Sequence, residues 1–177
     1  MRAPVLLAIL VSCCAGYAQE SDDNRLVLTL EATRDNPRNS EGSFVELNDG
    51  GILFVYTQFY GGNGDFASAR LAEVRSADGG LTWSAPKTVV EKENHLNVMS
   101  VSLLRLQRGP IAMFYLVKEA PDDCHPVMRT STDEGKSWSK PVPVIREPGY
   151  FVLNNDRVVQ LQRRRQAERV LQVRARH

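Results

Sequence analysis

The chain has 177 residues and a formal net charge of +1, with 42% hydrophobic and 24% charged residues. This length and hydrophobic content suit one globular domain of ordinary size. A net charge so close to zero gives no overall sign of a nucleic-acid-binding protein or of a protein that binds anionic membranes.

The N-terminus has the features of a targeting segment. Arg2 precedes the short apolar run Val5–Val11, and Gly16–Ala18 supplies small residues for cleavage. These features predict a signal peptide over residues 1–18 and export to the periplasm or the medium. An alternative stays open, because Leu10–Cys13 is similar to a bacterial lipobox, in which Cys13 would be lipidated and would anchor the protein to a membrane. No other stretch is long and apolar enough to span a bilayer.

Cysteine and histidine give no sign of a cofactor. After cleavage at Ala18 only Cys124 would remain, so no internal disulfide is expected. The histidines lie far apart, at His95, His125 and His177, and none has the spacing of a zinc ligand. We therefore expect no metal and no other cofactor.

The predicted elements are strands. Residues 19–37 form a polar leader followed by Arg25–Glu31, whose alternation of apolar and polar residues predicts a half-buried strand that could close a sheet. The turn Asn48–Gly51 is a strong hairpin signal. Two groups of four strands follow the same plan: Ser43–Leu47, Ile52–Gln58, Ser68–Arg75 and Trp83–Val90, then Val98–Leu106, Ile111–Lys118, Pro126–Thr130 and Trp138–Ile145. Asn155–Leu161 is predicted to open a third group.

The C-terminal segment, residues 162–177, differs from the rest of the chain because it contains six arginines and no turn signal. Three interpretations stay open: a tail left by a truncated or frame-shifted reading frame, a weak helix or disordered extension, and an arginine-rich binding element. An exported protein would not meet nucleic acid, so nucleic acid is not an expected partner.

A repeated motif sets the fold. Ser76–Pro86 (SADGGLTWSAP) and Ser131–Pro141 (STDEGKSWSKP) are identical at six of their eleven positions and lie 55 residues apart. A fixed period of this size is typical of repeat architectures. Glycine allows a positive φ in the turn, the aspartate accepts backbone hydrogen bonds, and tryptophan anchors the turn to its sheet. We therefore expect a structural role for the motif residues Ser76, Asp78, Gly80 and Trp83 and for Ser131, Asp133, Gly135 and Trp138.

The motif is that of the Asp-box, or BNR repeat, and the chain resembles bacterial exo-sialidases of the neuraminidase-like superfamily. The segments NVMSVSLLRL (97–106), FYLVKEAPDDCHPVMRTSTDEGKSW (114–138) and GYFVLNNDRVVQL (149–161) support this resemblance. In that family the box joins the third and fourth strands of a blade in a six-bladed β-propeller. The resemblance implies an all-β chain in which residues 38–161 form about two blades and the start of a third. It also implies a glycan substrate, a terminal sialic acid or a related acidic sugar.

The resemblance also implies site residues. The family uses three arginines for the substrate carboxylate, an aspartate in a mobile early loop as acid/base, and a tyrosine nucleophile assisted by a glutamate. Arg38 stands where the first of these arginines is expected, although the usual Arg-Ile-Pro is absent. Asp65 ends a glycine-rich loop where the acid/base aspartate is expected, and Arg157 opens the third blade as a further substrate-binding candidate.

Two departures leave the activity open. Gln58–Tyr60 stands where the second early arginine is expected. Six blades need roughly 330 residues, so the later blades, with the family's nucleophile, are expected to be missing. The first hypothesis is an N-terminal part of an exo-α-sialidase-like glycoside hydrolase, weakly active or inactive alone. The alternatives are a non-catalytic module that binds glycans or a protein partner, and a structural propeller piece.

Overall fold

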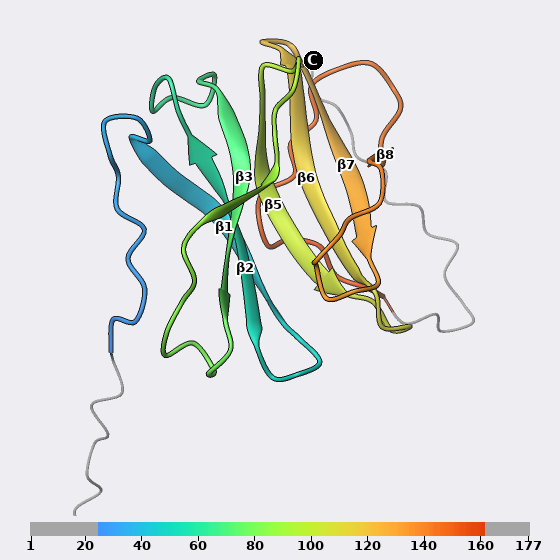
Figure 1. Ribbon diagram of the computed structural model, residues 1–177. Helices are drawn as coiled ribbons and strands as arrows, with labels where there is room; N and C mark the ends of the chain where they lie inside the picture. Colours follow the sequence, from blue (N-terminus) through green and yellow to red (C-terminus); the bar gives the residue numbers. More distant parts are fainter. Residues whose placement is uncertain (1–24, 162–177) are drawn as a thin grey trace, which may run out of the picture.

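The computed structural model describes residues 25–161, so the predicted signal peptide (1–18) and the arginine-rich tail (162–177) lie outside the described residues. All regular structure within this range is β. It forms two four-stranded antiparallel sheets in which strands that are neighbours in sequence are also neighbours in the sheet (Figure 1). Within the same range, no helix has the length and apolar character needed to cross a membrane.

The strands confirm the predicted plan of two groups of four. The first sheet contains β1 (Arg38–Glu46), β2 (Ile52–Phe59), β3 (Ala69–Ser76) and β4 (Lys87–Val90). The second contains β5 (Asn97–Arg105), β6 (Ile111–Ala120), β7 (Asp123–Ser131) and β8 (Val142–Pro143). The first three strands of each sheet have eight to ten residues, whereas β4 has four and β8 has two.

The outer strands begin later than predicted. Expected to start at Trp83 and Trp138, they start only after the proline that ends each motif. The Trp83 indole N–H donates to the carbonyl of Gly80 at 3.0 Å, which holds the ring in the turn. Proline has no N–H for the ladder, so pairing resumes beyond it.

Two predicted strands, Arg25–Glu31 and Asn155–Leu161, do not form. Residues 25–31 have apolar side chains that pack on the first sheet, with Leu28 and Leu30 against the cluster that contains Tyr56. No described strand pairs with either segment, and an extended run without a ladder partner is not a strand. Alternation alone therefore predicted extended backbone but not pairing.

The main core lies between the two sheets, where β1 and β5 adjoin (Figure 1). Leu53, Val55 and Leu71 of the first sheet are fully buried, as are Val101 and Ile111 of the second. Burying this much apolar surface on both sheets is the main reason why they dock.

The strands β1 and β5 carry the same irregularity. In each, the pairing register shifts at one point, between Ser40 and Ser43 in β1 and between Met99 and Ser102 in β5. Within the shifts, Glu41 and Ser100 have φ values of 55° and 59°. The Ser100 hydroxyl donates to the Glu41 carboxylate at 3.0 Å, so the two bulges touch. Such non-glycine conformations are strained, and bulges of this kind often adjoin functional sites.

In both motif turns the aspartate accepts hydrogen bonds from its own turn. In the first, the Thr82 backbone N–H and hydroxyl donate to the Asp78 carboxylate at 2.9 and 2.6 Å. The Ser76 hydroxyl donates to Asp78 at 2.8 Å and accepts from the backbone N–H of Gly80 at 2.8 Å. The second turn repeats these bonds with Ser131, Asp133, Gly135 and Ser137.

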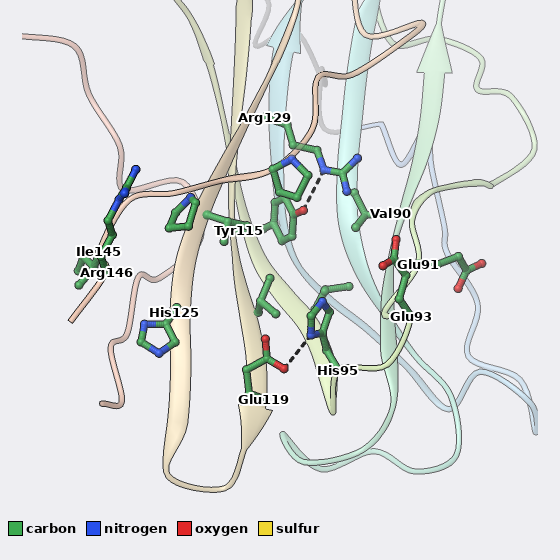
Figure 2. Close-up of a pocket in the computed structure, with 15 residues that line it drawn as sticks. Val90, Glu91, Glu93, His95, Tyr115, Glu119, His125, Arg129, Ile145 and Arg146 are labelled. Atoms are coloured by element: carbon green, nitrogen blue, oxygen red, sulfur yellow. Dashed lines mark hydrogen bonds and ion pairs between the residues drawn. The ribbon is translucent and has the colours of Figure 1, made fainter. Parts of the chain in front are cut away.

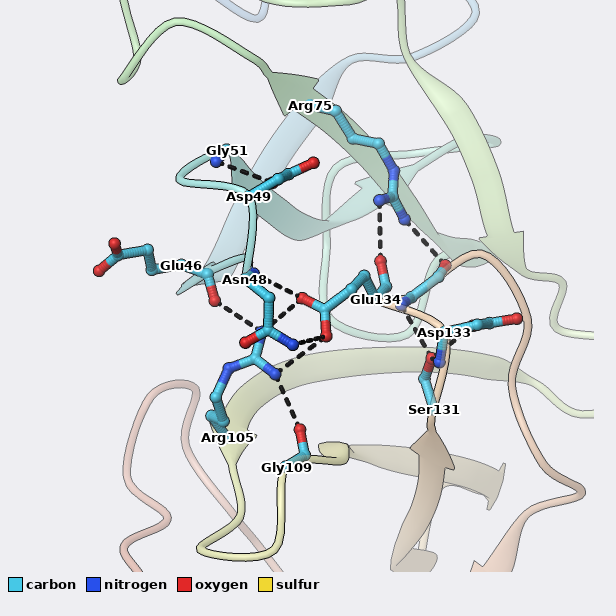
Figure 3. A network of polar contacts seen from close by, with 11 residues as sticks. Glu46, Asn48, Asp49, Gly51, Arg75, Arg105, Gly109, Ser131, Asp133 and Glu134 are labelled. Carbon is cyan, nitrogen blue, oxygen red and sulfur yellow. Dashed lines mark hydrogen bonds and ion pairs between the residues drawn. The ribbon is translucent and has the colours of Figure 1, made fainter.

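A polar network joins the second motif to the first sheet (Figure 3). Glu134 accepts from the Arg105 guanidinium at 2.6 Å and from the Asn48 backbone N–H at 2.9 Å. Arg75 of β3 donates to the carbonyls of Glu134 and Gly135 at 2.9 and 2.8 Å. The motif turn thus closes its own sheet and also contacts the neighbouring one.

Candidate functional site

Arg38 and Asp65, predicted separately, lie together. Arg38 is the first residue of β1, and Asp65 lies in the loop between β2 and β3. Nη1 of Arg38 is 2.7 Å from Oδ1 of Asp65 and also donates to the carbonyl of Asn63 at 3.0 Å. The remaining guanidinium nitrogens donate to Ser40 at 3.1 Å and to Glu41 at 3.3 Å.

A buried aromatic ring supports the arginine. Phe59 is the residue paired with Arg38 across β1 and β2, and it is fully buried. The Arg38 guanidinium carbon lies 4.3 Å from the centre of the Phe59 ring, which is a cation–π contact. The Arg38 side chain is 27% exposed and that of Asp65 is 61% exposed. The cation is therefore held in place while the carboxylate faces solvent.

The loop that carries Asp65 is anchored to the second sheet. The Lys118 ammonium of β6 and the Asn97 amide of β5 both donate to the carbonyl of Asp65, each at 2.9 Å. Asn97 also donates to the carbonyl of Ala67 at 3.0 Å. The sequence interpretation missed both residues. The available signal was a lysine that ends the otherwise apolar run Ile111–Lys118.

Arg157 does not contact Arg38 or Asp65. Its side chain is exposed, and its backbone N–H donates to the Ser102 hydroxyl at 3.3 Å. Ser102 lies five residues beyond Asn97 in β5, which corresponds to roughly 16 Å along a strand. The neighbouring Asp156 accepts from Ser43 at 2.9 Å, so this segment contacts the bulged part of β1.

Arg70, a further arginine of the first sheet, lies in register with Asn39 and Gln58, so its side chain is on the face of the sheet opposite to Arg38 and Phe59. Arg70 of β3 pairs with Gln58 of β2, and its Nε donates to the Gln58 side chain at 2.7 Å. Its guanidinium carbon lies 5.4 Å from the centre of the Tyr60 ring. Arg70 therefore does not replace the second early arginine that the sequence lacks.

A separate cavity of about 470 Å³ opens between the sheets at their outer edge (Figure 2). Its floor is apolar, and two polar contacts line it. Nε of Arg129 donates to the Tyr115 hydroxyl at 3.0 Å, and Nδ1 of His95 lies 2.8 Å from the Glu119 carboxylate. Burial raises the pKa of Tyr115. No predicted site residue lines this cavity. Across residues 25–161, no three His, Cys, Asp or Glu side chains are grouped to hold a metal ion.

Residues 68–166 match the BNR repeat-like domain family. The chain belongs to this family. Within residues 25–161 this BNR-repeat protein has two repeats in full, and each sheet is one propeller blade. No curated protein matches the chain in sequence.

The fold is similar to that of solved sialidases. A Hadza microbial sialidase, Hz136, is 15% identical with a TM-score of 0.53, over 62% of this chain and 26% of that one. The NanB sialidase from Streptococcus pneumoniae is 10% identical with a TM-score of 0.53, over 68% and 38%. A protein of unknown function from Dyadobacter fermentans is 19% identical with a TM-score of 0.53, over 63% and 37%.

These likenesses show a sialidase-type β-propeller fold, of which the described residues form two blades. The matched part corresponds to 26–38% of the length of those three chains.

Proposed function

We propose that this BNR-repeat chain belongs to an exo-α-sialidase-like glycoside hydrolase and supplies the acid/base and carboxylate-binding part of its site. The observation that supports this most directly is the 2.7 Å contact between Arg38 and Asp65. It joins a fixed planar cation to an exposed carboxylate, which are two of the group types that hydrolysis of an acidic sugar requires.

In this mechanism the substrate carboxylate replaces Asp65 on the Arg38 guanidinium. Asp65 can move because it is 61% exposed and follows three glycines. Protonated Asp65 then donates its proton to the glycosidic oxygen as the bond to the sugar breaks. No nucleophile is assigned among the described residues. The proposal therefore gives this chain the binding of the substrate carboxylate and the proton transfer, but not the attack on the sugar.

One observation favours a second candidate, a non-catalytic module that binds glycans or a protein partner. Every guanidinium nitrogen of Arg38 already donates to a group of the same chain. An arginine satisfied in this way stabilises the loop without any ligand. Under this candidate the exposed surface around Asp65 recognises a partner but performs no proton transfer.

Hydrolysis of a fluorogenic α-sialoside by the full chain tests the proposal. Asp65→Asn should lower kcat by about 100-fold or more, since it removes the acid. Arg38→Met should act mainly on KM by removing the carboxylate partner. The matched control is Asp122→Asn, at an exposed aspartate in the turn between β6 and β7. Binding of free sialic acid without turnover would instead support the non-catalytic module, and neither binding nor turnover would refute both.

The proposal includes export: a signal peptide is predicted over residues 1–18, and export would bring the site to sialylated glycans. N-terminal sequencing of the mature protein tests this part. A first residue of Gln19 is expected, whereas a lipid-modified Cys13 would indicate a membrane-anchored form.

A further inference from the structure

Lys118 is a buried lysine beneath the Asp65 loop. The residue is 1% exposed, although lysine is almost never fully buried unless it is paired. Its ammonium donates to the carbonyl of Asp65 at 2.9 Å. It also lies 4.2 Å from the centre of the Phe66 ring and 5.5 Å from that of Tyr150. A carbonyl and two ring faces therefore surround the charge in place of water.

The neighbouring Asn97 also donates to the carbonyl of Asp65. Asn97 and Lys118 pair across β5 and β6, and both donate to the same carbonyl of Asp65. Asn97 is fully buried, and its side-chain oxygen has no hydrogen-bond partner within the described range. A buried acceptor without a partner is costly. The orientation of Asn97 therefore follows its two donor bonds, to the carbonyls of Asp65 and Ala67.

The ring of Tyr150 is also held in place. The Cys124 backbone N–H donates to the carbonyl of Gly149 at 3.2 Å. The Phe151 backbone N–H donates to the carbonyl of Cys124 at 2.9 Å. Cys124 is the residue opposite Lys118 on β7. The segment that follows β8 thus fixes Tyr150 beside the ammonium through backbone bonds.

The loop can move where these contacts do not hold it. Gly61 and Gly62 have φ values of 77° and 147°, which only glycine adopts without strain. A Cβ added at Gly61 or Gly64 would meet no atom within 4 Å. The polar side chains that hold the loop come from three strands: Arg38 of β1, Asn97 of β5 and Lys118 of β6.

We infer that Lys118, with Asn97, is a positioning residue that fixes the backbone of Asp65 against the second blade. The contact sets where the Asp65 carboxylate lies relative to Arg38, and it makes the geometry of that pair depend on the docking of two blades. Its effect on catalysis rests on the proposed function, whereas the anchoring itself does not.

Amide hydrogen exchange of the full chain tests the anchor. Lys118→Met keeps the length of the side chain and removes the charge and the bond to Asp65. Exchange across residues 61–67 should become about tenfold faster, while β1 and β2 keep their protection, since only the loop loses a contact. The matched control is Lys140→Met, at an exposed lysine, which should change nothing. Unchanged exchange in the loop of folded Lys118→Met would overturn the inference.

A measurement on the unsubstituted chain covers the case in which Lys118→Met does not fold. Acetylation of lysines, followed by mass spectrometry, should modify Lys118 at least about tenfold more slowly than Lys140, because a closed loop shields its ammonium. Equal rates would show an open loop and refute the anchor.

The kinetic measurement separates the anchor from the proposed function. On the α-sialoside, Lys118→Met should lower kcat and leave KM nearly unchanged, because Lys118 acts through Asp65 and not on the substrate. A chain that neither binds free sialic acid nor turns over the sialoside, but whose loop is freed by Lys118→Met, would refute the proposed function and keep the anchor. If the unsubstituted chain turns over the sialoside and Lys118→Met does so with the same kcat, the positioning role is refuted.

Discussion

Asn48 and Glu134 join the two blades through a pair of hydrogen bonds. The Asn48 backbone N–H donates to one carboxylate oxygen of Glu134 at 2.9 Å, and its side-chain amide donates to the other at 2.8 Å. Glu134 has a φ of 62° in the second Asp-box, where the first box has Gly79 with a φ of 71°. The strained position in the second box therefore holds a side chain that reaches the hairpin of the first blade.

Removing this contact should separate the blades before it disturbs either sheet. Glu134→Ala should lower the free energy of unfolding by about 1–3 kcal/mol, because it leaves the charged Arg105 without its carboxylate. A double-mutant cycle with Asn48→Ala should show a coupling energy of about 0.5 kcal/mol or more. Urea denaturation measures both. Glu31→Ala, at an exposed glutamate, is the control, and strictly additive effects would contradict the bridge.

The same contact should weaken in acid. The hydrogen bond from Arg105, followed by the one from the Asn48 backbone, holds the pKa of Glu134 below its ordinary value. A lowered folded-state pKa means that the carboxylate stabilises the fold above the unfolded pKa of about 4.3 and loses this effect as the pH falls through the lower folded value. Unfolding curves from pH 6 to pH 3 should therefore converge for wild type and Glu134→Ala.

The Asp-box aspartates should also lose their stabilising effect in acid. The hydrogen bonds from Thr82 and then that from Ser76 lower the pKa of Asp78 to about 2, and the corresponding bonds in the second box lower that of Asp133. Their stabilisation is complete above the unfolded pKa of about 3.9 and declines as the pH falls toward the folded value. Asp78→Asn should be less stable than wild type at pH 7, with the difference shrinking below pH 4. Thermal melts across this range, with Asp122→Asn as control, check the prediction.

Equivalent glycines of the two boxes should respond differently to alanine. At Gly80, with a φ of 93°, an added Cβ would lie 3.6 Å from Ile52, an ordinary contact. At Gly135, with a φ of 75°, it would lie 2.8 Å from Leu53 and 3.0 Å from Arg75. Gly80→Ala should therefore cost about 1–2 kcal/mol from backbone strain alone, and Gly135→Ala more. Equal losses of stability in denaturant titrations would contradict this, since only Gly135 faces the other blade.

The outer face of the first blade should promote association of the chain. Phe44 is 56% exposed, and its ring stacks on Phe54 at 4.1 Å and meets Trp83 edge-on at 6.1 Å. Contiguous exposed apolar groups of this kind favour contact with other molecules. Phe44→Ser should raise the concentration at which light scattering increases. Leu81→Ser is the control, because Leu81 is equally exposed, at 57%, but stands outside this aromatic group.

The sequence by itself determined the local features. The Asp-boxes follow from their residues because Ser76, Asp78 and Gly80 bond within one turn, so every partner lies within a few positions. The order and approximate bounds of the strands follow from alternation and turn signals in the same way. The late start of β4 and β8 also had a local cause, the proline after each box, but the prediction gave more weight to the tryptophan.

Only the tertiary structure decided the site. Arg38 and Asp65 are 27 residues apart, and Lys118 lies 53 residues beyond Asp65. The resemblance to sialidases placed the first two separately, but their contact depends on how the loop folds over the end of β1. Lys118 and Asn97 bind a backbone carbonyl, which every residue possesses, so no side-chain pattern marks the partner. Their role arises because two blades dock, and docking depends on the burial of both sheet faces together and not on any single segment.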